Sequence, residues 1–91
     1  MESPERVRPE SHQKGSEALA EARNLRRLQW MIGMVLSAIY QHPDLTVEQA
    51  SEMVANARQA ALGMFPGKEL AFDLLYRPRL QRAMKDRFHM Q

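Results

Sequence analysis

Apolar residues spaced alternately three and four apart follow two long stretches of the chain. An advance of three or four residues returns a side chain to nearly the same face of an α-helix. Each stretch therefore predicts a helix with one apolar side that needs a partner helix. The first stretch contains Leu25, Leu28, Ile32, Val35 and Ile39, and the second contains Val47, Ala50, Val54, Ala57, Ala61 and Met64.

Local signals predict where the first helix begins and ends. Ser16 can accept a backbone N–H, and Glu17 and Glu21 follow it in the positions that the positive end of a helix dipole favours. The helix is expected to run to about Gln41, because the residue before Pro43 is pushed out of the α region.

The second helix has the clearest start in the chain. Thr46 is followed three residues later by Gln49, which is a capping-box pattern. Pro66 and Gly67 end the helix, which is expected over 46–64. Only about four residues join it to the first helix, so the two are expected to form an antiparallel hairpin.

A third helical stretch begins near Lys68 and is interrupted by Pro78. Because the proline removes one helical hydrogen bond and restricts the residue before it, we expect two pieces, 68–76 and 78–88. The apolar side of the first piece consists of Leu70, Ala71, Leu74 and Leu75.

A charged pair is predicted within this third stretch. Asp73 lies one helical turn before Arg77, the spacing at which opposite charges on a helix meet.

These elements predict an all-α protein, because no segment alternates apolar and polar residues for long enough to form a strand. The expected architecture is a small helical bundle, made of the antiparallel hairpin and a third helix that a proline breaks. Residues 1–15 are rich in Pro, Glu, Arg and Ser and are expected to be a disordered arm. Residues 16–91 are expected to form a single helical domain.

The small size of the chain favours self-association. A chain of 91 residues has a thin stability margin, and without cysteine it cannot add disulfides. The segment 30–40 is apolar nearly all round, more than one hairpin partner covers. We expect a homo-oligomer, most simply a dimer, whose interface includes Leu25, Leu28, Trp30, Met31, Ile32, Val35 and Ile39. The alternative is that this seam is the inner face of a monomeric bundle.

A basic row near the C-terminus suggests a second class of partner. Arg77, Arg79, Arg82 and Lys85 could contact an anion or nucleic acid phosphates. The alternative is a solvated helix end, where cations complement the dipole and Asp86 offsets the charge. The net charge of +2 neither requires nor excludes nucleic acid.

The sequence indicates no catalytic, cofactor or metal site. His12, His42 and His89 are too far apart in sequence to form a paired-ligand motif, and no phosphate loop or nucleophile motif occurs. The longest apolar run, residues 30–40, is too short to span a membrane. The lack of cysteine fits a cytoplasmic location. We therefore expect a non-catalytic, self-associating interaction or regulatory module, with nucleic-acid binding through the basic helix as the alternative.

Overall fold

The computed structural model describes the backbone of residues 9–89 and the side chains of residues 15–89. Within this range the chain forms four helices and no strand, which confirms the predicted all-α class and small helical bundle. The helices are α1 (Pro9–Gln41), α2 (Val47–Met64), α3 (Glu69–Leu75) and α4 (Arg77–Phe88).

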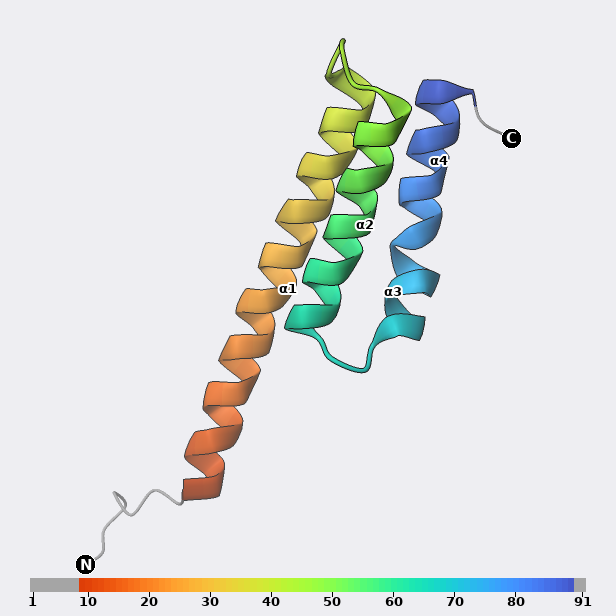
Figure 1. Cartoon of the computed structure of the whole chain (residues 1–91). Helices are drawn as coiled ribbons and strands as arrows, with labels where there is room; N and C mark the ends of the chain where they lie inside the picture. The colour runs from red at the N-terminus through yellow and green to blue at the C-terminus, as the bar shows by residue number, and fades with distance from the viewer. Residues whose placement is uncertain (1–8, 90–91) are drawn as a thin grey trace, which may run out of the picture.

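α1 and α2 form an antiparallel hairpin, and α3 followed by α4 runs back alongside it (Figure 1). α4 packs against both α1 and α2, and α3 packs against α2 and α4. α1 has 33 residues and is about 50 Å long, whereas α2 has 18 residues and is about 27 Å long. The N-terminal half of α1 therefore extends well beyond the end of α2 (Figure 1).

One apolar core joins α1, α2 and α4. Ile32 and Ile39 of α1 and Leu80 of α4 are almost completely removed from water. The side of α2 that faces them is made of small residues, which allow its backbone to lie close to its neighbours. The remaining buried residues are Leu28, Val35, Ala50, Ala57, Ala61, Phe72, Ala83 and Met84.

The predicted start of α2 is confirmed in atomic detail. The Gln49 backbone N–H donates to Thr46 Oγ1 at 3.1 Å, and the Thr46 backbone N–H donates to Gln49 Oε1 at 3.0 Å. Each residue thus satisfies a backbone donor that the helix start would leave unpaired.

The start of α1 differs from the prediction. The helix begins at Pro9, so residues 9–15, expected in the arm, are helical and Ser16 lies inside the helix rather than at its cap. Proline suits the first helical position because its fixed φ matches a helix and its missing N–H would be unpaired there anyway. The rest of the predicted arm, residues 1–8, lies outside the described residues.

The predicted break at Pro78 is confirmed, and it is short. Tyr76 is the single residue between α3 and α4, and Pro78 is the second residue of α4. The Tyr76 N–H still donates to the Phe72 carbonyl at 2.8 Å, and the Leu80 N–H donates to the Tyr76 carbonyl at 3.1 Å. Hydrogen bonding therefore continues on both sides of the proline.

The apolar side predicted for α3 does not face the core. Leu70, Leu74 and Leu75 are 72%, 67% and 64% exposed, whereas Phe72 is buried against the hairpin. The larger ring of Phe72 occupies the core side of this short helix. The leucine side is left toward solvent.

Candidate interaction groove

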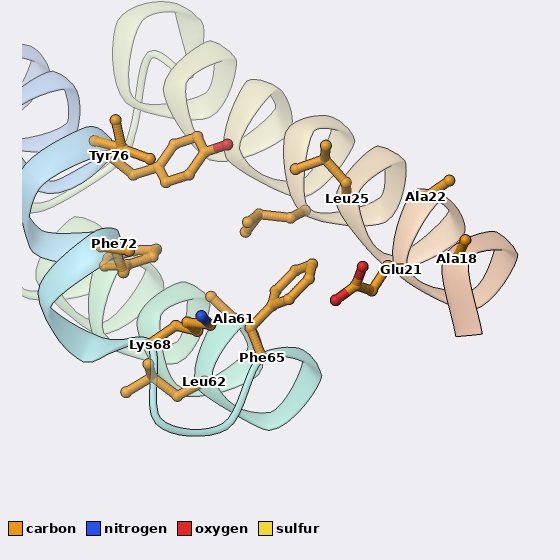
Figure 2. Close-up of a pocket in the computed structure, with 13 residues that line it drawn as sticks. Ala18, Glu21, Ala22, Leu25, Ala61, Leu62, Phe65, Lys68, Phe72 and Tyr76 are labelled. Carbon is orange, nitrogen blue, oxygen red and sulfur yellow. The ribbon is translucent and has the colours of Figure 1, made fainter. Parts of the chain in front are cut away.

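An open groove lies between α1 and α3, whose backbones stay apart. Each pair of helices in the described part of the chain packs together except this one. The groove has a volume of about 590 Å³ and runs between the N-terminal half of α1, the end of α2, and α3 (Figure 2). We call this region the open end of the molecule.

The lining of the groove is mainly apolar. Alanines on each helix make shallow positions, and larger aliphatic and aromatic side chains project between them (Figure 2). Leu25, on the α1 wall, is 43% exposed although it belongs to the predicted apolar seam. The apolar lining residues are Ala18, Ala22, Leu25, Leu28, Ala61, Leu62, Phe65, Ala71, Phe72, Leu75 and Tyr76.

Two charged side chains of opposite sign complete the lining. Glu21 comes from α1, and Lys68 comes from the connection between α2 and α3 (Figure 2). An apolar cleft with few polar groups suits the side chains of a helix or peptide.

The turn between α2 and α3 positions one side of the groove. Phe65 follows the last residue of α2, and its carbonyl accepts a hydrogen bond from the Lys68 N–H at 3.2 Å. Gly67 between them has φ of 78°, a backbone angle that favours glycine. The turn thereby carries both Phe65 and Lys68 into the lining.

An ion pair fixes α3 against α2. Arg58 Nε donates to Asp73 Oδ1 at 3.1 Å, and Arg58 Nη2 donates to Asp73 Oδ2 at 3.2 Å. These bonds, reinforced by the positive charges of Arg58 and Arg77, lower the pKa of the Asp73 carboxyl, although partial burial opposes them. The predicted pairing of Asp73 with Arg77 is therefore wrong, because the guanidinium of the neighbouring helix makes both hydrogen bonds.

The opposite end of the bundle, where α1 turns into α2, is closed by α4. Arg87 Nη1 donates to the Ile39 carbonyl at 3.3 Å, and Arg87 Nη2 donates to the Pro43 carbonyl at 3.2 Å. Carbonyls at the end of a helix lack helical partners, so this guanidinium caps α1 from another helix. We call this region the closed end.

A tyrosine adds a second link at the closed end. Tyr40 Oη donates to Asp86 Oδ2 at 2.9 Å, which joins α1 to α4. This hydrogen bond raises the pKa of Tyr40, as do its partial burial and the charge of the carboxylate, whereas Arg82 lowers it.

The structure divides the predicted interface residues into two groups. Leu28, Ile32, Val35 and Ile39 are buried within a single chain. Met31 is half-buried, and Leu25 and Trp30 remain exposed, Trp30 by 70%. The interface between copies stays a prediction, and the surface of α1 available to it comprises the groove wall at Leu25 and the outer side at Trp30.

The predicted anion-contacting residues all lie on α4. Arg77, Arg79, Arg82 and Lys85 are exposed. Their contact with an anion or nucleic acid stays a prediction.

Sequence reasoning missed the lining residues outside α1. Lys68, Leu75 and Tyr76 were not expected to act with Leu25, because their proximity follows from the fold rather than from any local pattern. A usable signal was the mismatch in length between the first predicted helix and the second. A longer helix must leave part of its apolar seam without a hairpin partner.

Across residues 15–89, no three His, Asp or Glu side chains gather where they could hold a metal ion. None of the helices in the described part combines the length and apolar character needed to cross a membrane.

Comparison with known proteins gives no relative: the chain matches no family model, no curated protein and no solved structure.

Proposed function

We propose that this protein is a small non-catalytic helical module that associates with a second copy of itself through apolar surface on α1 and beside it. The observation that carries the proposal is the open end. There an apolar groove about 590 Å³ in volume lies beside a half of α1 that extends past its hairpin partner. The simplest assembly is a homodimer.

Exposed apolar side chains support an interaction role. Contiguous apolar surface on a soluble protein marks sites of interaction with other molecules. Leu25 and Leu75 line opposite walls of the groove and remain partly or largely exposed. Contact with another protein surface would remove both from water.

The extended half of α1 supports self-association as well. Isolated helices shorter than about 12–15 residues are marginal in water, and most helical stability comes from packing. This half of α1 lies beyond α2 and so lacks the packing that stabilises 28–39. A second copy would supply it, and the lack of cysteine fits this way of gaining stability and a cytoplasmic location.

Light scattering coupled to size-exclusion chromatography over a dilution series tests self-association. We expect the measured mass to fall from a multiple of 10.5 kDa toward 10.5 kDa as the protein is diluted. A mass of 10.5 kDa throughout the series up to about 1 mM would reject the proposal.

Nucleic-acid binding through α4 is the alternative function. The exposure of Arg77, Arg79, Arg82 and Lys85 on one helix supports it. It requires an affinity for DNA or RNA that falls steeply with salt, because bound phosphates release counterions. A mobility-shift assay at low ionic strength that shows no complex would reject it.

A further inference from the structure

We propose that the groove of one copy receives the extended half of α1, residues 15–24, from a second copy, and that the two α1 helices run antiparallel about a two-fold axis near Ala22. This inference rests on the proposed self-association and specifies its surface and geometry. Each copy both supplies a helix and receives one.

The extended half of α1 has side chains that suit such a contact. Ala18 and Ala22 are small residues one turn apart, and they already line the groove on its α1 side. Small side chains at this spacing let two helix backbones approach closely. Leu19 is 66% exposed in the single chain, and Leu25 follows in the next turns, so each copy offers apolar groups on either side of Ala22.

The far wall of the groove suits the same occupant. Leu75 of α3 lines the groove and is largely exposed, and Phe72 and Tyr76 stand beside it. The rings of Phe72 and Tyr76 lie 5.6 Å apart between centroids. A helix lying along α1 would therefore bury Leu75 and the exposed part of Tyr76 at the same time, beside the ring of Phe72, which the single chain already buries.

The order of charges along α1 favours antiparallel pairing. Glu17 and Glu21 precede Arg23, Arg26 and Arg27 in the sequence, so the extended half changes from acidic to basic along its length. Parallel copies would align acid with acid and base with base. Antiparallel copies place the acidic segment of each helix beside the basic segment of the other, which lowers the electrostatic free energy.

The positive charge of Lys68 in the groove also favours antiparallel pairing. Lys68 is the cationic group of the lining. In the antiparallel arrangement the acidic segment of the incoming helix enters the groove on the side of the bundle where Lys68 lies. Glu17 and Glu21 of the incoming helix then bring negative charge toward Lys68.

Two-fold symmetry makes the contact self-sufficient. An isologous interface uses the same surface of both copies, so one association event fills both grooves and covers both extended helix halves. No apolar lining is left open to recruit a third copy. The assembly therefore stops at a dimer.

The first experiment uses two leucines on one helix. Leu75→Glu places a charge in the groove, and Leu70→Glu places the same charge on α3 at a position outside the lining. Both leucines are mostly exposed, so neither variant disturbs the core. Sedimentation of the full chain is expected to show that Leu75→Glu raises the dimer dissociation constant by at least about 100-fold, since burying one such side chain contributes about 10-fold to 100-fold and the two-fold contact buries one in each groove. Leu70→Glu should leave the constant within about twofold.

The second experiment reads the direction of the helices. The chain has no cysteine, so a single introduced cysteine reports one position. Under mild oxidation, Ala22→Cys should give a disulfide-linked dimer, and Ser37→Cys, at an exposed position far from the proposed axis, should not. A mixture of Gly15→Cys and Gln29→Cys chains should give mixed dimers, because these positions lie seven residues on either side of Ala22.

The outcomes separate this geometry from self-association itself. A dimer that Leu75→Glu leaves intact and Trp30→Glu dissociates overturns the groove but keeps the proposed function. Homodimeric cross-links of Gly15→Cys and of Gln29→Cys without mixed dimers overturn the antiparallel direction. A chain that is monomeric at every concentration overturns both the function and this inference.

Discussion

At the closed end of the bundle a side chain from α4 reaches across to hold the turn between α1 and α2, whereas at the open end no part of α3 packs against α1. Arg87 satisfies two carbonyls at the closed end, and Tyr40 binds Asp86 beside it. At the open end Leu25 and Leu75 face a groove instead of each other.

The contrast teaches that one helix can serve two purposes along its length. From Leu28 to Ile39 the apolar seam of α1 is buried in the chain's own core. Toward the N-terminus the same helix continues beyond its partners, so its apolar groups are available to another molecule. Substitutions near the closed end should therefore mainly change the free energy of unfolding, and substitutions near the open end should mainly change self-association.

The largest expected effect is a core truncation in the closed half. Ile32→Ala should lower the free energy of unfolding by about 2–5 kcal/mol, because it removes buried methyl groups and leaves a cavity. Val54→Ala, at a half-buried position of α2, should cost less. Urea unfolding monitored by circular dichroism measures both. A larger loss for Val54→Ala than for Ile32→Ala would contradict the description of the core.

Removing the cap from the closed end should have the next largest effect. Arg87→Ala is expected to cost about 1–2 kcal/mol, because a carbonyl at the end of α1 and a carbonyl in the turn that follows both lose a charged donor. Arg79→Ala, an exposed arginine on the same helix, should change stability by less than about 0.5 kcal/mol. Equal effects of the two variants in thermal unfolding would show that the closed end does not depend on this contact.

Two glycines give a matched pair with opposite signs. A Cβ at Gly33 in α1 would meet nothing within 4 Å, so Gly33→Ala should raise stability by about 1 kcal/mol through helix propensity. A Cβ at Gly67 also meets nothing, but φ there is positive, so Gly67→Ala should lower stability by about 1 kcal/mol. Differential scanning calorimetry on both variants checks the signs, and a loss for Gly33→Ala would place close packing on the outer side of α1.

The smallest expected effect is a pH-dependent one at the open end. The pKa of Asp73 is lower in the folded chain, so its pairing with Arg58 stabilises the fold above about pH 4 and this stabilisation is lost as the pH falls through the folded value. Asp73→Asn should therefore lower stability modestly at pH 7, with the difference from the unaltered chain shrinking toward pH 2. Unfolding midpoints measured across this range report it.

A double variant provides the control for this pH effect. In an Arg58→Gln background, Asp73→Asn should change the pH dependence less than it does in the unaltered chain, because the hydrogen-bonded partner is already absent and only the weaker influence of Arg77 remains. If Arg58→Gln alone leaves the pH dependence of stability the same as in the unaltered chain, that pH dependence comes from a carboxyl other than Asp73.

Local patterns predicted the helices of this fold well. The spacing of apolar residues identified the hairpin, Thr46 and Gln49 marked the start of α2, and Pro78 marked the break before α4. Each of these features depends on residues within a few positions of one another. Sequence reasoning handles such features because the interacting groups are neighbours along the chain.

The features that sequence reasoning missed depend on residues far apart. Asp73 pairs with Arg58 across helices rather than with its neighbour in sequence, and Phe72 rather than the leucines of α3 enters the core. The groove likewise requires the relative placement of α1 and α3. Local propensity contains no information about how a short helix rotates against a hairpin, because packing decides it.

The contacts of α4 with both hairpin helices also determine when the chain can fold during synthesis. Leu80 and Ala83 complete the core, and Arg87 then fastens the first turn, so a nascent chain lacks these groups until the ribosome has passed residue 87. Until α4 has been made, Ile32 and Ile39 are only partly shielded from water. The growing polypeptide therefore exposes part of this apolar core until α4 has been synthesised, and exposed apolar surface of this kind favours aggregation.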